Sequence, residues 1–353
     1  MTGEVDLSVE IAGIRFPNPV WVASGCFNYG REFAHLYPLR ELGAVCTKGT
    51  APEPWPGNPG VRMAETPAGM LNAIGLMNPG IDHYLQVDGP WLRAQGVKIV
   101  VNIVGRTVEE YVRVAERLTP EVADAVELNI SCPNVKEGGL AFGTSPRATY
   151  GVTAAVRRAT SLPLFVKLSP NVTDITELAR AAEAAGADGL TLINTLLGMA
   201  IDIRRRRPVL GNVFGGLSGP AIKPIALRMV WQVVGAVRIP VVGIGGIATA
   251  QDALEFLMAG ARAVQVGTAC FANPRAPLEI IAGIRQFMVE NGIRRVTELI
   301  GAARPAGEAA LGNLPPLGDA GADGRLQPLQ PGPGSRTGAG EALRQWLKDA
   351  DRA

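Results

Sequence analysis

The chain has 353 residues, 47% of them hydrophobic, and its 34 lysines and arginines nearly balance 32 acidic residues, for a formal net charge of +2. This length suits one α/β barrel with appendages. The small net charge excludes the strong basic field that draws proteins onto nucleic acid or anionic lipid. We therefore expect a small molecule or another protein as partner, with no nucleic acid and no membrane.

The N-terminal stretch MTGEVDLSVEIAG carries acidic residues where a signal peptide carries basic ones, and it lacks a long apolar core. No apolar run approaches the roughly 18 residues that a bilayer-spanning helix needs. These features predict a cytoplasmic protein. The chain has only two histidines, and its four cysteines form no CxxC pair, so we expect no metal site; the cysteines are Cys26, Cys46, Cys132 and Cys270.

Residues 6–19 predict a small hairpin that turns near Gly13 and lies over the bottom of the main fold. Eight short β-rich runs then follow, at 19–23, 43–48, 97–103, 124–130, 162–168, 189–194, 240–245 and 262–267. Between them, amphipathic stretches predict helices at 107–118, 174–186, 224–234 and 249–260, several of which begin at Thr or Asp and end at Gly.

Apolar strands that alternate with helices indicate a parallel sheet with both faces covered, and eight such units close into a (β/α)8 TIM barrel. The alternative is an open doubly wound sheet, but no GxGxxG follows the first strand. Residues 303–340 hold nine glycines and six prolines but no Val, Ile or Phe. We therefore expect a catalytic barrel domain over 1–302 and a disordered tail over 303–353.

Polar residues recur where the predicted strands end, which is where barrels carry their chemistry. They are Ser24, Gly25, Lys48, Asn102, Asn129, Lys167, Asn194 and Thr195. Any one of them could simply be a turn residue. Their repetition at equivalent positions predicts a binding site.

Two features suggest what this site binds. The glycine turns GIGGI (243–247) and VGT (266–268) follow the last two strands, where backbone N–H groups can hold a phosphate, although glycines also serve merely as turns. A carboxamide offers a donor and an acceptor in one plane, which matches the edge of a cyclic imide or pyrimidine. The asparagines that would form such a pocket are Asn72, Asn129, Asn134 and Asn194.

Cys132 lies in NISCPNVKEGG (129–139) near the end of the fourth strand, where it could be a nucleophile, a proton acceptor or an inert thiol. The absence of a histidine nearby in sequence weakens a Cys–His hydrolase interpretation. A cysteine base works as the thiolate, and a free thiol titrates near about pH 8.5, so activity should rise toward alkaline pH. The other three cysteines are expected to be core thiols.

Residues 5–300 resemble the catalytic subunit of class 1 dihydroorotate dehydrogenase. The matching motifs are TKGT (47–50), NAIGLMNPG (72–80), NISCPNVKEGG (129–139), KLSPNVTDI (167–175), GGLSGPAIKPIALRMV (215–230), GIGGI (243–247) and AVQVGTA (263–269). They are more similar to subclass 1B, whose catalytic subunit passes electrons to NAD through a partner, than to the self-contained fumarate-using subclass 1A.

The resemblance implies oxidation of (S)-dihydroorotate to orotate in pyrimidine (UMP) biosynthesis, with hydride transfer to N5 of FMN and a C5 proton removed by Cys132. It implies substrate contacts at Lys48, Asn72, Ala73, Ile74, Gly75, Leu76, Asn129, Asn194 and Thr195. The implied FMN contacts are Ser24, Lys48, Gly49, Asn102, Asn129, Lys167, Ile193 and Gly219, with the phosphate at Gly245, Gly246, Gly267 and Thr268. The segment 133–142 resembles the family's mobile loop over the substrate.

The resemblance also implies a homodimer that assembles with a subunit carrying FAD and a 2Fe–2S cluster into a heterotetramer. Within enzymes, the alternatives are other FMN barrels, such as a dihydropyrimidine dehydrogenase-like domain or a tRNA dihydrouridine synthase; the near-neutral charge argues against a tRNA substrate. A non-catalytic barrel that scaffolds a flavoprotein complex is the alternative from a different class.

Overall fold

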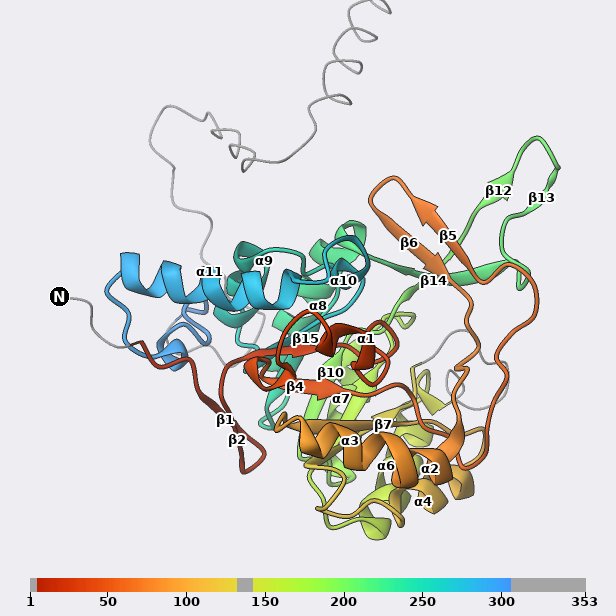
Figure 1. The fold of residues 1–353 in the computed structure, drawn as a ribbon, viewed down its shortest axis with the longest axis horizontal. Helices are drawn as coiled ribbons and strands as arrows, with labels where there is room; N and C mark the ends of the chain where they lie inside the picture. The colour runs from red at the N-terminus through yellow and green to blue at the C-terminus, as the bar shows by residue number, and fades with distance from the viewer. Residues whose placement is uncertain (1–4, 132–141, 306–353) are drawn as a thin grey trace, which may run out of the picture. The chain divides into compact units, whose positions relative to one another are not determined.

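The described part of the chain is built around a closed barrel of parallel strands (Figure 1). The structure is a computed structural model that describes residues 5–131 and 142–305. The barrel strands are β3 (Val20–Val22), β4 (Ala44–Cys46), β7 (Ile99–Ile103), β8 (Ala125–Asn129), β9 (Leu164–Leu168), β10 (Gly189–Leu192), β15 (Val241–Ile244) and β16 (Ala263–Val266). They pair in chain order, and β16 pairs with β3 to close the ring. The predicted (β/α)8 barrel is confirmed, and the open sheet is excluded.

Helices cover the outside of the barrel. They are α1 (Arg31–Ala34), α2 (Gly80–His83), α3 (Gly89–Ala94), α4 (Val108–Ala115), α6 (Pro146–Ala159), α7 (Ile175–Ala184), α8 (Lys223–Val234), α9 (Ala250–Met258), α10 (Ala269–Ala272) and α11 (Ala276–Glu290). The side chains of Thr107, Asp174 and Thr249 accept hydrogen bonds from the first turns of α4, α7 and α9. These are the N-caps that the sequence predicts.

The N-terminal hairpin is also present, as antiparallel strands β1 (Val9–Ile11) and β2 (Ile14–Phe16). Its turn uses Ala12 and Gly13, both with positive φ. The Phe16 ring lies 4.6 Å from that of Trp21, a centroid distance at which aromatic rings attract. Glu10 and Ala12 line a surface depression together with residues that immediately precede β15 and β16. Because the residues before the strands lie at the amino-terminal end of the barrel, the hairpin lies at that end, as expected.

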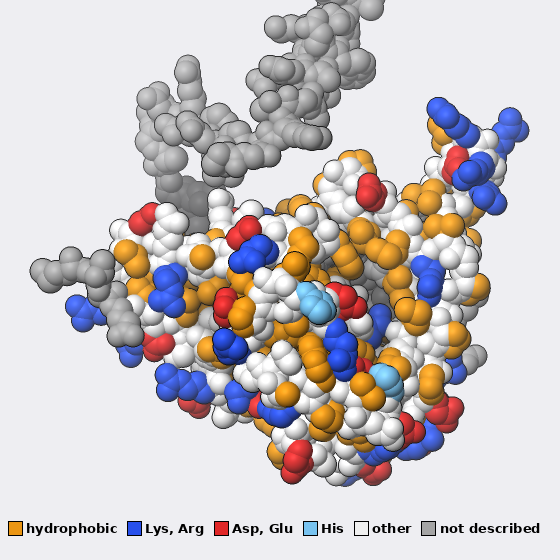
Figure 2. Space-filling model, viewed as in Figure 1, with side chains coloured by type: hydrophobic (Ala, Val, Ile, Leu, Met, Phe, Trp, Pro, Cys, Tyr) orange, Lys and Arg blue, Asp and Glu red, His pale blue; other side chains and the backbone are white. Residues whose placement is uncertain are grey.

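A second sheet, which the sequence pattern did not predict, extends from the other end of the barrel. Its strands are β5 (Met63–Thr66), β6 (Gly69–Asn72), β11 (Leu196–Met199) and β14 (Phe214–Ser218), in the order β11-β14-β6-β5. A hairpin of β12 (Ile201–Asp202) and β13 (Arg207–Pro208) extends it. Arg204, Arg205, Arg206 and Arg207 are exposed on this hairpin, where Figure 2 shows a group of basic side chains at the upper right.

The expected disordered tail lies almost wholly outside the described residues, so the division into 1–302 and 303–353 stays a prediction. Chain contacts divide the molecule into residues 1–311 and 312–353, and the whole described part belongs to the first unit. In residues 5–131 and 142–305, no helix combines the length and apolar character needed to cross a bilayer.

Candidate active site

A cavity lies at the carboxyl ends of the barrel strands, under the second sheet. Its wall includes Ser24, Gly25, Cys26, Lys48, Gly49, Ile74, Gly75, Leu76, Asn102, Asn129, Lys167, Asn194 and Thr195, with Met63, Met70, Asn72 and Ser218 from the second sheet. A second cavity adjoins it, lined among others by Ile193, Gly219, Gly245, Gly246 and Gly267. Ser24, Lys167 and Thr268 belong to both walls, so the two form one continuous site.

The residues predicted from the sequence converge here. Every predicted FMN contact lines one of the two cavities. Every predicted substrate contact lines the first cavity except Ala73. The Ala73 side chain is only 1% exposed and packs in a small cluster with Leu71 and Leu210 instead of facing the cavity.

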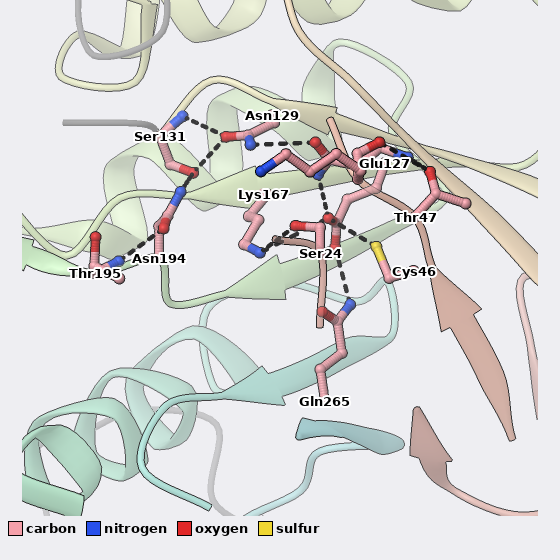
Figure 3. A network of polar contacts seen from close by, with 12 residues as sticks. Ser24, Cys46, Thr47, Glu127, Asn129, Ser131, Lys167, Asn194, Thr195 and Gln265 are labelled. Carbon is pink, nitrogen blue, oxygen red and sulfur yellow. Dashed lines mark hydrogen bonds and ion pairs between the residues drawn. The ribbon is translucent and has the colours of Figure 1, made fainter. Parts of the chain in front are cut away.

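A chain of hydrogen bonds fixes the amide groups along one wall (Figure 3). Asn129 donates through Nδ2 to Asn102 Oδ1 at 3.3 Å and accepts at Oδ1 from the Ser131 hydroxyl at 3.1 Å. Asn194 donates to Ser131 Oγ at 2.9 Å, and its own Oδ1 accepts from the backbone N–H of Thr195 at 2.9 Å. The amides are therefore held in defined orientations before a ligand binds, which lowers the entropy cost of binding.

Asn72 comes from the opposite side, on β6, and donates to the carbonyl of Gly216 on β14 at 3.2 Å. Asn72, Asn129 and Asn194 thus meet at one cavity, although they are far apart in sequence. Asn134, the fourth predicted member of this group, lies outside the described residues.

Lys167 forms part of the cavity floor. It comes from β9, its side chain is 5% exposed, and its ammonium donates to Ser24 Oγ at 3.2 Å. Among the described residues, its nearest carboxylate is Glu127 on β8, 3.8 Å away and 0% exposed. Burial alone would raise the pKa of Glu127, but Lys167 and hydrogen bonds from Gln265, Cys46 and Asn102 hold it below the usual value. The floor thus contains an ion pair with its positive end toward the ligand space.

The glycine turns after β15 and β16 fit a phosphate group. Gly245 and Gly246 have positive φ, and a Cβ on Gly246 would lie 2.7 Å from the Lys223 backbone N at the start of α8. Within the described residues, the backbone N–H groups of Gly245, Gly246 and Gly267 donate no hydrogen bond to other protein groups. Such N–H groups beside a helix N-terminus are the donors that an anionic oxygen requires.

The cysteines correct one expectation. Cys46 and Cys270 are buried as predicted, but Cys26 is half-buried and lines both cavities. Burial raises the pKa of the Cys26 thiol, an effect that Lys167 and Lys48 only partly offset. Cys26 is therefore a neutral wall residue of the site and not a core thiol.

The predicted base, Cys132, lies just beyond Ser131 and outside the described residues, as does most of the predicted loop 133–142. Its role stays a prediction. In the two described segments, no group of three His, Cys, Asp or Glu side chains could hold a metal ion.

Sequence reasoning missed the polar layer beneath the cavity, formed by Glu127, Gln265 and Cys46. Gln265 donates to Glu127 Oε1 at 2.9 Å, and the Cys46 thiol lies 3.1 Å from Oε2. A signal was available, because inward-facing residues alternate along a barrel strand. Glu127 stands two residues before Asn129 on the same strand, so both point inward.

The fold and the site together define an α/β-barrel protein that places two glycine turns beside a rigid, amide-lined pocket. The family model for dihydroorotate dehydrogenase matches residues 6–288. The chain is 59% identical over 302 residues to a protein from Geotalea uraniireducens named "Dihydroorotate dehydrogenase B (NAD(+)), catalytic subunit", covering 85% of this chain and 99% of the relative. A relative of the same name from Geobacter metallireducens is 60% identical over 299 residues, covering 84% of this chain and 98% of the relative.

A crystal structure of DHODH from Eimeria tenella in complex with ferulenol shares the fold. The TM-score is 0.69 at 24% identity, over 85% of this chain and 89% of the other. The chain belongs to the dihydroorotate dehydrogenase family, which confirms the resemblance seen in its motifs.

Proposed function

We propose that this chain is the catalytic subunit of an NAD-linked dihydroorotate dehydrogenase, which oxidises dihydroorotate to orotate in pyrimidine biosynthesis. The observation that carries this proposal is the convergence of Asn72, Asn129 and Asn194 on one cavity beside a glycine cradle. Its support is the name shared by relatives that are 59–60% identical over almost their whole length. The name also favours NAD over fumarate as the final acceptor.

FMN is the cofactor that this site would hold. Gly245, Gly246, Gly267 and Thr268 would bind its phosphate through backbone donors, and Lys167 would lie near its pyrimidine portion. Ser24, Lys48, Gly49, Asn102, Asn129, Ile193 and Gly219 would complete its contacts. When bound, FMN supplies the acceptor for the hydride that leaves C6 of dihydroorotate.

The substrate would bind in the amide-lined part of the site. Asn72, Asn129 and Asn194 would pair with the C=O and N–H edge of the ring. Lys48, Thr195 and the turn at Ile74, Gly75 and Leu76 would complete the pocket. Because the amide orientations are preset, the substrate would be held in one pose, as a stereospecific transfer requires.

Cys132 would act as the base. Its thiolate would take the C5 proton while the C5–H electron pair forms the new C5=C6 bond and the hydride leaves C6. The balanced outcome is one proton on sulfur and one hydride, which is a proton and two electrons, on the acceptor. Because the thiolate is the active form, the rate should increase with pH through the titration of this thiol.

The onward path of the electrons requires a partner. The relatives are named as catalytic subunits, which supports a separate electron-transfer subunit. We infer that this subunit carries FAD and a 2Fe–2S cluster, and that two copies of each chain form a heterotetramer.

A purified, full-length preparation tests these assignments. We expect bound FMN and dihydroorotate-dependent reduction of an artificial dye, extended to NAD only when the partner is present. Cys132→Ser should slow turnover at least a hundredfold and most strongly below neutral pH, whereas the matched variant Cys270→Ser should stay near wild-type activity. Fumarate-dependent turnover without a partner, or full activity in Cys132→Ser, would contradict the proposal.

A further inference from the structure

The polar layer beneath the cavity contains a fully buried carboxylate. Glu127 points into the barrel from the middle of β8 and is 0% exposed. Barrel interiors are normally filled by branched apolar side chains, and a buried charge is costly unless it is paired and hydrogen-bonded. A carboxylate at this position therefore needs an explanation.

Each oxygen of Glu127 has partners. Gln265 donates to Oε1 at 2.9 Å, and Asn102 donates to Oε2 at 2.5 Å. Cys46 lies 3.1 Å from Oε2. Lys167 forms an ion pair with this carboxylate, with its ammonium 3.8 Å from Oε2. Figure 3 shows Cys46, Lys167 and Gln265 approaching Glu127 from separate strands.

Lys167 connects this layer to the ligand space. Its ammonium also donates to Ser24 Oγ, and both residues line the two adjoining cavities. Glu127 lines neither cavity, so any influence that it has on a bound ligand must pass through Lys167, through Asn102 of the first cavity wall or through its own field. On the adjacent strand, Asn129 is the residue paired with Lys167, so this ion pair lies directly beside the amide wall.

We propose that Glu127 is a positioning residue, which anchors the Lys167 ammonium in the cavity floor, balances part of its charge and thereby tunes the reduction potential of the flavin above. This inference rests on the proposed function, since it requires flavin in the site. Two-electron reduction by hydride adds negative charge to the bound cofactor, and a nearby cation favours that change. Glu127 opposes part of this effect and fixes where the cation lies.

The sign of a substitution follows from this arrangement. Glu127→Gln keeps the volume and some of the hydrogen bonds but removes the negative charge, so it leaves the positive charge of Lys167 unbalanced. Reduced flavin should then be favoured and the midpoint potential should rise. Lys167→Met should have the opposite effect.

The test is the flavin midpoint potential of the purified holoprotein, measured by slow enzymatic reduction against a reference dye. For Glu127→Gln we expect a ratio of reduced to oxidised flavin at least tenfold larger than in the wild type at the same solution potential. For a two-electron couple this corresponds to a midpoint potential higher by about 30 mV. Asp88→Asn is the matched control, because Asp88 is a buried, paired carboxylate that lines neither cavity. The flavin of this variant should have the same midpoint potential as that of the wild type. An unchanged or lower potential in Glu127→Gln overturns the proposal.

If Glu127→Gln does not fold, the comparison of Lys167→Met with the double variant E127Q/K167M replaces it. Without the cation, the buried carboxyl should take up a proton, so the two potentials should agree within about threefold in the flavin ratio. A larger difference would show that Glu127 acts without Lys167 and would overturn the proposal. If the wild-type protein binds no flavin, the proposed function is contradicted instead. If dihydroorotate reduces the flavin but wild type and Glu127→Gln have equal midpoint potentials, only this inference is contradicted.

Discussion

Replacing Lys167 by Met should expose how much the protein depends on the buried ion pair. The 3.8 Å separation of the charged atoms gives a Coulomb attraction of about 4 kcal/mol at an effective dielectric constant of about 20. Both side chains are at most 5% exposed, so solvent screens this attraction little. Removing one partner of such a pair typically costs about 3–5 kcal/mol, and we expect a loss of unfolding free energy in this range at pH 7.

The pH dependence gives a second check on the same pair. The pKa of Glu127 is lowered in the folded wild-type protein, so its contribution to stability is present above the unfolded pKa, about 4.3, and is lost as pH falls through the folded value. Lys167→Met removes this contribution, and its unpaired carboxyl has to take up a proton, which costs less free energy as pH falls toward the unfolded pKa. The stability difference between wild type and variant should therefore be full at pH 7 and become smaller toward pH 4.

Urea unfolding of flavin-free protein, followed by tryptophan fluorescence, measures both effects without a contribution from ligand binding. The double variant E127Q/K167M should recover at least about 2 kcal/mol of the loss, because a buried amide, unlike the unpaired carboxyl, does not have to take up a proton at pH 7. A loss below about 1 kcal/mol in Lys167→Met, or a double variant whose loss equals the sum of the single losses, would refute this reasoning.

Three further outcomes follow from particular contacts. Gly246→Ala should weaken FMN binding more than tenfold in a fluorescence titration. The φ of Gly246 is positive, and the new Cβ would lie 2.7 Å from the Lys223 backbone. Unchanged affinity for FMN would exclude this turn from the phosphate site. Asn194→Ala removes the hydrogen bond to Ser131 and should raise the dissociation constant for orotate about tenfold in calorimetry, while the FMN content stays constant. An unchanged dissociation constant would exclude Asn194 from the substrate pocket. Thr249→Ala removes the capping box of α9 and should cost about 1 kcal/mol in urea unfolding with no change in turnover, so a large loss of activity would contradict its purely structural role.

The barrel was predictable because its strands are short, apolar runs separated by capped helices, and this pattern suits few other folds. The second sheet was not. Its strands β6 and β14 read GMLN and FGGLS, whose glycines and mixed polarity resemble loop sequence. They become strands because they pair with each other above the barrel, and this is a tertiary effect that no local pattern reports.

The site was predictable where polar residues end a strand, as at Asn129 and Lys167. Glu127 was missed because it stands inside an apolar strand and its partners come from four other strands, β4, β7, β9 and β16. Cys26 was assigned to the core because small thiols are usually buried, but the glycine-containing turn after β3 brings it into the cavity wall. In both cases the outcome depends on which strands become neighbours, and the sequence shows this only once the barrel is assumed.

The most direct test of the central claim is a single turnover. Anaerobic mixing of the purified full-length chain with dihydroorotate in a stopped-flow instrument should bleach the flavin absorbance and release one orotate per flavin, with no partner subunit present. A flavin-bearing chain whose spectrum does not change with saturating dihydroorotate would contradict the account.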